Sequence, residues 1–325
     1  MYGGSVISSS IVERAYVTVE DNDILELVVE EDVRRITSPE DLIQDNGMFD
    51  AILSVIEYFD LGDARVRIAV RSDIPVSAGL SGSTAIITAL VAALLEWMNT
   101  NDYKPGEKTA WSKAVPLNKY LLAETVRHIE LYFLKIVCGY QDAYMCSFGS
   151  LNFLDFCDKE NYLSLSREPL GTVESLSGLS PKLPILLAHT GIKRVSGSVH
   201  KPIRDRWIEG DRLIVNGVLR LAHIARMAKK AVVSGDWDML GEAMNENHEI
   251  VRTFGSSSEV NEKIIRTALE TGAIAAKLAG AGKGGTIIAL NPNPDEMIAA
   301  LKDAGAGRIL FPRPVEGILR EDNTE

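Results

Sequence analysis

The chain contains few cysteines, few aromatic residues and no excess of positive charge. Its three cysteines, Cys138, Cys146 and Cys157, have neither the spacing of a metal site nor the density of a disulfide framework. The formal net charge of −11 argues against a general nucleic-acid or membrane-surface binder. We see no signal peptide and no apolar run that approaches the roughly 20 residues of a membrane span. We therefore expect a cytoplasmic protein without a membrane or nucleic-acid partner.

The composition is that of an ordinary globular protein, with 46% hydrophobic and 24% charged residues. A length of 325 residues is sufficient for two domains with separate cores. A polar segment rich in Gly, Ser and Pro, residues 163–183, suggests the boundary, so we expect domains at 1–180 and 181–325. Helical and strand patterns mix without regular alternation, which predicts an α+β fold.

Hydrophobic periodicity predicts the individual elements. The predicted strands are residues 5–19, 24–29, 64–72, 149–156, 183–189 and 286–290. The predicted helices are residues 49–59, 83–98, 117–133, 205–234, 236–253 and 258–271.

A loop of small residues, 73–85, joins a predicted strand to a predicted helix. Unpaired backbone N–H groups and the helix dipole favour an anion at such a helix start, and glycines allow close backbone approach. The loop matches neither G-x-x-x-x-G-K-[ST] nor G-x-G-x-x-G. Taken alone, it is equally compatible with phosphate binding and with a tight turn.

Two carboxylates are candidates for chemistry at this loop. Asp142 follows an apolar stretch and precedes a strand, so we expect it in a semi-buried crevice. There it could accept or orient a hydroxyl proton during phosphoryl transfer, or it could be a turn residue. Glu130, near the end of the preceding helix, could be a Mg²⁺ ligand or a solvated surface charge.

A second glycine-rich loop, residues 280–285, has four glycines in six positions before an apolar strand. Such density indicates close backbone approach or positive φ, although a β-bulge or hairpin loop would also explain it. Sequence spacing cannot show whether the two loops meet.

Together these features resemble the GHMP kinases. The segment Pro75-x-x-x-Gly-Leu-Ser-Gly-Ser-Thr-Ala85 is similar to the central family motif P-x-x-x-G-L-G-S-S-A-A. The segment Lys277-Leu-Ala-Gly-Ala-Gly-Lys-Gly-Gly285 is similar to the C-terminal motif K-x-[ST]-G-[AS]-G-x-G-G, and Asp142 lies where the family carries its catalytic Asp. The resemblance implies ATP-dependent phosphorylation of an alcohol. It also implies an N-terminal domain like domain 2 of ribosomal protein S5 and a ferredoxin-like C-terminal domain.

The resemblance further implies a set of site residues. Asp142 would face the acceptor hydroxyl, and Ser83 and Glu130 would hold Mg²⁺. The ATP phosphates would lie against Pro75, Ala78, Gly79, Leu80, Ser81, Gly82, Ser83, Thr84, Ala85, Gly280 and Gly282.

The chain departs from the family pattern in two ways. Ser81 and Gly82 are exchanged relative to the Gly-Ser order of the motif, which removes a side-chain contact at Gly82. The N-terminal family motif is also missing, and the first residues resemble the segment just downstream of it. Either the start at Met1 is late or the protein functions without that motif.

Several stretches resemble the sugar-kinase branch, above all glucuronokinase. This implies phosphorylation of the anomeric hydroxyl of a sugar acid or similar anionic sugar, with Lys193, Arg194, His200 and Gly282 at the substrate. The first three lie in a basic segment that we expect to be a loop after a buried strand, and Arg side chains there would suit a carboxylate or phosphate. His200 alone could instead be a residue at the start of a helix. A homodimer is compatible with the sequence.

Three alternatives stay open. The chain could be a heptose-7-phosphate 1-kinase or a kinase of mevalonate or phosphomevalonate type. Outside the enzymes, it could be a catalytically silent nucleotide or sugar sensor. Retention of Ser83, Glu130 and Asp142 argues against a sensor, which needs no base together with a metal site.

Overall fold

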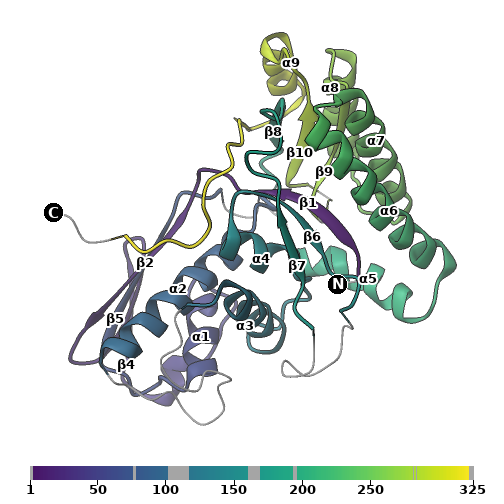
Figure 1. Ribbon diagram of the computed structural model, residues 1–325. Helices are drawn as coiled ribbons and strands as arrows, with labels where there is room; N and C mark the ends of the chain where they lie inside the picture. The colour runs from purple at the N-terminus through teal and green to yellow at the C-terminus, as the bar shows by residue number, and fades with distance from the viewer. Residues whose placement is uncertain are drawn as a thin grey trace.

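The computed structural model describes residues 3–75, 78–101, 117–159, 169–192, 196–280, 282 and 284–321. Within these residues the strands form two four-stranded sheets and one three-stranded sheet. Helices pack against the sheets (Figure 1). The α+β prediction is therefore confirmed.

The N-terminal sheet has the strand order β2-β5-β3-β4, and only its β3–β5 pair is parallel. Its strands are β2 (Ala15–Asp21), β3 (Leu25–Val29), β4 (Asp32–Ile36) and β5 (Val66–Ser72). The alternating pattern of β5 buries Val66, Ile68 and Val70 on one face. These side chains join one hydrophobic core with α1 (Asp50–Phe59), α2 (Gly82–Thr100), α3 (Lys119–Tyr132) and α4 (Gln141–Phe148). The 3-10 helix η1 (Pro39–Leu42) precedes α1.

The apolar composition of α2 has a structural explanation. Its 19 residues, with a mean hydropathy of 1.3, are long and apolar enough by composition to cross a membrane, a feature that we did not expect from the sequence. However, α2 packs against β2, α1, α3 and α4, and it buries Ile87, Leu90 and Leu94 in the core. A core helix of this kind passes the same test of length and composition.

A three-stranded antiparallel sheet contains β1 (Ser5–Ser9), β6 (Leu151–Asp155) and β7 (Thr172–Ser175). The single strand predicted over residues 5–19 is wrong, because β1 and β2 belong to different sheets. Between them the chain changes direction, and Arg14 donates hydrogen bonds to the Glu316 and Gly317 carbonyl oxygens. The sequence of residues 5–19 is rich in β-branched residues throughout, so it does not show that its two parts pair with strands of different sheets.

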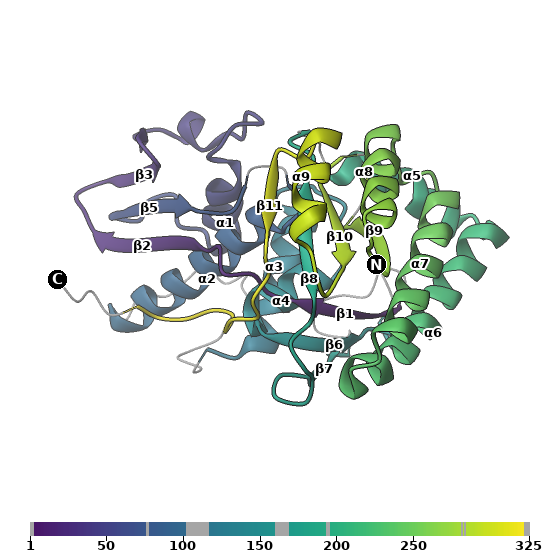
Figure 2. The ribbon, with the colours of Figure 1, turned by 90° about the horizontal axis from the view of Figure 1, so that it is seen from above.

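The C-terminal sheet is antiparallel throughout, in the order β11-β8-β10-β9. Its strands are β8 (Ile185–His189), β9 (Ala275–Ala279), β10 (Thr286–Leu290) and β11 (Arg308–Leu310). In chain order this is the 4-1-3-2 arrangement of a ferredoxin-like domain, as expected. The N-terminal sheet lies at the opposite end of the molecule from α6 (Arg212–Ser234) and α7 (Trp237–Thr253) (Figure 2).

Four long helices complete this part. One core joins α8 (Glu259–Glu270) and α9 (Asp295–Ala304) to one sheet face, and another joins α6 (Arg212–Ser234) and α7 (Trp237–Thr253) to the other. The single helix predicted over 205–234 is wrong: α5 (Ser196–Ile208) ends before Gly210, whose φ is +75°, and Asp211 caps α6. The sequence patterns also missed η1, β4, α4, β7, β9, α9 and β11.

The chain changes sheet between β7 and β8, and the domain division at residues 180/181 stays a prediction. The segment after β11 returns to the N-terminal half (Figure 1). There the Ser10 hydroxyl donates to the Val315 carbonyl oxygen at 2.7 Å and accepts from its N–H group at 2.9 Å. The Cβ of a side chain at Gly149 would lie 2.0 Å from the Gly317 nitrogen, so this crossing requires glycine.

Candidate functional site

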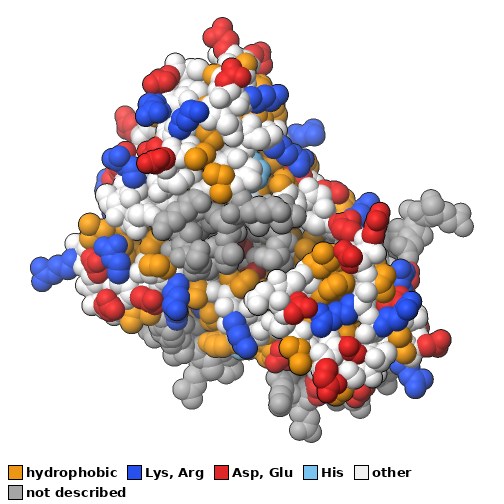
Figure 3. Space-filling view, turned by 180° about the vertical axis from the view of Figure 1, so that it is seen from behind, with side chains coloured by type: hydrophobic (Ala, Val, Ile, Leu, Met, Phe, Trp, Pro, Cys, Tyr) orange, Lys and Arg blue, Asp and Glu red, His pale blue; other side chains and the backbone are white. Residues whose placement is uncertain are grey.

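A large cleft is lined by residues of both halves of the molecule. It includes Ser8 of β1, the loop at Leu80, the start of α2, Asp142 of α4 and Lys277 of β9. On the face that Figure 3 shows, acidic and basic side chains are interspersed rather than gathered in one patch. The cleft is the candidate active site.

The first glycine-rich loop presents the N-terminus of α2 to this cleft. Ser81, the N-cap residue, has φ +61° and ψ +31°, and its side chain makes no capping hydrogen bond. Within the described residues, the N–H groups of Gly82, Ser83 and Thr84 have no protein hydrogen-bond partner. A left-handed conformation is unusual for serine and is typically found at functional sites. Unpaired N–H groups and the helix dipole make this end of α2 suitable for phosphate.

Glu130 is buried, with 3% of its surface exposed, and it lies against the first turn of α2. The Thr84 hydroxyl donates to its Oε1 at 2.6 Å, whereas Oε2 has no hydrogen-bond partner within the described residues. Burial raises the pKa of Glu130 to about 7, and the negative charge of Asp142 adds to this effect, while hydrogen bonds from Thr84 and Cys138 and the positive charge of Arg127 oppose it only in part. A solvated surface charge, the alternative interpretation of the sequence, is therefore excluded for Glu130.

The unpartnered Oε2 provides the test of a metal site. A buried carboxylate oxygen without a hydrogen-bond donor is unfavourable unless a cation occupies the space in front of it. Mg²⁺ prefers one or two carboxylates together with phosphate oxygens. A carboxylate beside a helix N-terminus that is suited to phosphate fits that chemistry.

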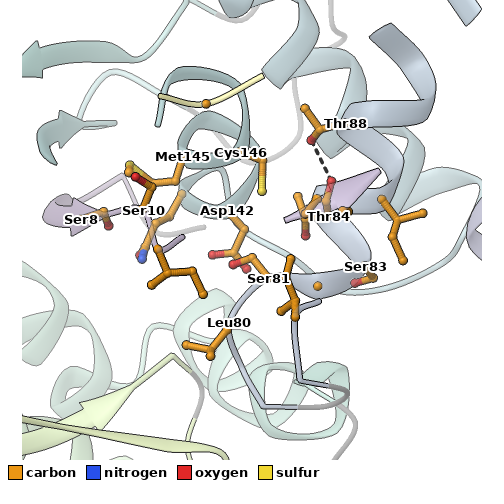
Figure 4. Close-up of a pocket in the computed structure, with 18 of the residues that line it drawn as sticks. Ser8, Ser10, Leu80, Ser81, Ser83, Thr84, Thr88, Asp142, Met145 and Cys146 are labelled. Atoms are coloured by element: carbon orange, nitrogen blue, oxygen red, sulfur yellow. Dashed lines mark hydrogen bonds between the residues drawn. The ribbon is translucent and has the colours of Figure 1, made fainter. Parts of the chain in front are cut away.

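The hydroxyl that contacts Glu130 belongs to Thr84, while Ser83 is exposed. Figure 4 shows Thr84 between Asp142 and Ser83, with the Thr84 backbone oxygen accepting a hydrogen bond from Thr88 at 2.7 Å. The sequence pattern selected Ser83 as the metal-binding hydroxyl and did not assign Thr84 a contact with the carboxylate. The metal role of Ser83 stays a prediction.

Asp142 is exposed and lies in the first turn of α4, where the helix dipole stabilises its negative charge. We expected a semi-buried crevice, and that expectation is wrong because α4 presents this turn to the cleft. The Asp142 carboxylate points toward the loop that carries Ser81 (Figure 4). Glu130 and Asp142, from two different helices, thus line one site.

The second glycine-rich loop is held by residues that sequence reasoning missed. On α8, Asn261 is fully buried, accepts from the Gly284 N–H group at 2.9 Å and donates to the Gly284 carbonyl at 3.3 Å. Gly282 has φ +89°, and a Cβ there would lie 2.0 Å from the Ser256 carbonyl oxygen. This loop therefore tolerates only glycine at position 282. No signal in the sequence links Asn261 to a loop 23 residues further along the chain.

The two glycine-rich loops meet. The buried Thr286 hydroxyl, at the start of β10, donates to the Ala78 carbonyl oxygen at 2.9 Å across 208 residues of sequence. The ferredoxin-like sheet therefore braces the loop at the start of α2. Strands β9 and β10 pair antiparallel on either side of this loop, so the hairpin alternative is confirmed, and Thr286 adds a contact with the first glycine-rich loop.

The predicted substrate residues are only partly placed. Lys193 and Arg194 lie outside the described residues. His200 lies near the start of α5, which agrees with the helix-start alternative rather than with the expected loop. Of the other predicted residues, Gly79, Leu80 and Gly280 line the cleft together with Ala85 and Pro75.

The architecture and the cleft are those of a phosphotransferase that acts on hydroxyl groups. The chain belongs to the GHMP kinases: residues 48–150 match the GHMP kinases N terminal domain, and residues 228–307 match the GHMP kinases C terminal model. Kinases of this family use ATP.

The proteins similar in sequence to this chain include both sugar kinases and mevalonate kinases. "Probable glucuronokinase 2" of Arabidopsis thaliana is 27% identical over 247 residues, which cover 75% of this chain but only 62% of that protein. The mevalonate kinase of Pyrococcus abyssi is 27% identical over 346 residues, covering 100% of this chain and 94% of that protein. The D-glycero-alpha-D-manno-heptose 7-phosphate kinase of Campylobacter jejuni is 26% identical over 66% of this chain and 58% of its own length.

Solved structures support the fold. Lactococcus lactis galactokinase in complex with galactose has a TM-score of 0.73 at 16% identity, covering 97% of this chain and 89% of that chain. Streptococcus pneumoniae phosphomevalonate kinase, solved with phosphomevalonate and AMPPNP, has a TM-score of 0.71 at 14% identity. The match covers 97% of this chain and 94% of that chain.

Proposed function

We propose that this protein transfers the γ-phosphate of ATP to the anomeric hydroxyl of an anionic sugar, with a sugar acid as the first candidate. The observation that carries the proposal is the grouping of a helix N-terminus suited to phosphate, a buried carboxylate with an unpartnered oxygen, and an exposed carboxylate on a second helix. Phosphoryl transfer needs positioning and charge neutralisation more than covalent chemistry, and these groups supply both.

The residues then have distinct roles. Backbone N–H groups at the start of α2 bind the ATP phosphates. Glu130 Oε2 holds Mg²⁺, which neutralises phosphate charge when bound, with Ser83 as a candidate second ligand and Thr84 orienting the carboxylate. Asp142 orients the acceptor hydroxyl and takes its proton.

The choice of a sugar acid rests on similarity to plant glucuronokinases and on sequence stretches shared with the sugar branch. The heptose-7-phosphate kinase of Campylobacter jejuni supports a phosphorylated sugar as the alternative acceptor. A mevalonate-type activity is the second candidate, because the archaeal mevalonate kinases match nearly their whole length.

An acceptor panel tests the proposal. ADP release should be measured with glucuronate, heptose 7-phosphate, mevalonate, galactose and no acceptor, and the product examined by phosphorus NMR. We expect turnover with a sugar acid and a new anomeric phosphate signal. Turnover with mevalonate alone would overturn the sugar assignment, and no turnover with any acceptor would favour a silent sensor.

The variant Asp142→Asn tests the catalytic assignment in the same assay. We expect kcat to fall by at least about 100-fold, in the range of an absent general base, while the affinity for ATP changes little. A variant that kept the full rate would remove Asp142 from its role.

A further inference from the structure

A lysine ammonium lies in the cleft without a carboxylate partner within the described residues. Lys277 is on β9, opposite Ile288 of β10. Its neighbours Ala276 and Leu278 join the core formed with α8 and α9, so Lys277 lies on the other sheet face, where α7 packs. Both Lys277 and Asp142 line the cleft.

The surroundings of Lys277 do not neutralise its charge. Its Nζ donates to the Leu278 carbonyl oxygen at 2.5 Å, and it makes no ion pair within the described residues. Burial lowers the pKa of Lys277 to about 8. On α8, the Glu262 carboxylate is already engaged with His248 at 3.2 Å. A half-buried ammonium without a counter-ion is costly, and a bound anion would remove that cost.

An unpaired amide lies on the helix that covers this strand. Asn247 of α7 is partly buried, lines the same cleft and makes no hydrogen bond within the described part of the chain. Asn is unfavourable in the middle of a helix, so the position of Asn247 there, without a hydrogen bond to the described residues, is consistent with a ligand-binding role. An amide N–H group facing a cleft can bind a carboxylate or phosphate oxygen.

We propose that Lys277 and Asn247 bind the anionic group of the acceptor, so that the enzyme selects an alcohol carrying a carboxylate or phosphate over a neutral sugar. This inference rests on the proposed function and adds a specificity site to it. A neutral sugar would leave the ammonium unpaired, whereas an anion gains a charge-assisted hydrogen bond in a partly dry cleft.

The test compares Lys277→Met with Lys263→Met, which removes a lysine of α8 that lies outside the cleft. With glucuronate or heptose 7-phosphate as acceptor, we expect Lys277→Met to raise KM for the acceptor by about 10- to 100-fold, which corresponds to about 1.4–2.8 kcal/mol. KM for ATP should not change, and Lys263→Met should match the wild type. Asn247→Ala should raise KM for the acceptor by a smaller factor. Comparing the two acceptors separates a carboxylate from a phosphate ligand.

Three results would overturn the inference: an increase in KM for ATP alone, an equal loss with neutral galactose, or a wild-type enzyme that accepts only neutral sugars. The last result would leave the proposed kinase activity intact. Should the wild type phosphorylate nothing, calorimetric titration with glucuronate decides the matter. Binding by the wild type and loss of binding in a folded Lys277→Met variant would support the site, and equal or absent binding would overturn it. Thermal unfolding of each variant shows whether it is folded.

Discussion

At the scale of single residues, Glu130 lies in an environment that disfavours its charged form. Its carboxylate is buried beside a second negative charge, and within the described residues its Oε2 has no hydrogen-bond donor. Such an arrangement disfavours the charged form that a metal requires. Binding of Mg²⁺ with nucleotide would relieve it.

We predict that Glu130→Gln stabilises the free protein at pH 8 and abolishes activity. Folding raises the pKa of Glu130 from 4.5 to about 7, so the folded protein favours the neutral carboxyl group. The contribution of Glu130 to the free energy of unfolding is therefore complete below pH 4.5 and is lost as the pH rises through 7. At pH 8 the free energy of unfolding of the variant should exceed that of the wild type by on the order of 3 kcal/mol. At pH 4.5 the difference should be small. Thermal unfolding at both values, without metal, measures this difference.

The matched control is Glu57→Gln, which alters an exposed carboxylate of α1. It should leave stability unchanged at both pH values. An equal stability of wild type and Glu130→Gln at pH 8 would show that Glu130 is not a buried, uncompensated charge.

The two hydroxyls at the start of α2 should differ in their effects. Thr84→Val removes the hydrogen bond to Glu130 Oε1, so we expect a several-fold higher Mg²⁺ concentration for half-maximal activity and a loss of about 1–2 kcal/mol in stability. Ser83→Ala should raise the Mg²⁺ requirement without affecting stability, because Ser83 is exposed.

Titration of activity with Mg²⁺ at saturating ATP separates the two variants, and thermal unfolding reports stability. An unchanged Mg²⁺ titration for Ser83→Ala would remove Ser83 from the metal site. The same result for Thr84→Val would show that the carboxylate is held without its hydroxyl donor.

At the scale of elements, the two glycine-rich loops differ in how strictly their backbones require glycine. Gly282 has positive φ and lies against the Ser256 backbone, whereas among the described residues a Cβ at Gly82 would meet only the Ile74 side chain, with Cγ2 at 3.5 Å, an ordinary contact. Glycine is thus sterically required by the second loop but not at position 82 of the first.

We predict that Gly282→Ala costs about 2–4 kcal/mol in stability, since it combines backbone strain with a backbone clash. Gly82→Ser should fold with a stability close to wild type. Chemical denaturation of both variants provides the measurement. Comparable stabilities for the two would mean that the 280–285 loop can move away from Ser256.

The elements that carry the carboxylates are themselves fixed by a buried polar network. Lys159 pairs with Glu124 of α3 at 2.7 Å, and the Tyr144 hydroxyl of α4 donates to the same carboxylate. The Gly171 N–H group donates to the Tyr144 oxygen at 2.8 Å. This network connects α3, which carries Glu130, to α4, which carries Asp142.

At the scale of the whole molecule, contacts distant in sequence hold the two halves together. Thr286 joins the glycine-rich loops, and the segment around Val315 returns to the end of β1. The site is therefore assembled from both halves and does not belong to either alone.

We predict that Thr286→Val costs about 1–3 kcal/mol, because it leaves the Ala78 carbonyl oxygen without its donor in a buried position. The loop at the start of α2 would lose its brace, so KM for ATP should rise several-fold while KM for the acceptor changes less. Steady-state kinetics and thermal unfolding test both effects. An unchanged KM for ATP would show that the first loop holds its shape independently.

The sequence by itself determined the α+β class, most of the long elements and both glycine-rich loops, and it singled out Glu130 and Asp142 as candidate site residues. These features depend on local periodicity, turn residues and short motifs, which neighbouring residues encode. Only the tertiary structure decided that residues 5–19 divide between two sheets, that Thr84 contacts Glu130 and that Asn261 and Thr286 secure the loops. Those outcomes depend on which surfaces meet after the chain folds, and contacts across up to 208 residues leave no local pattern.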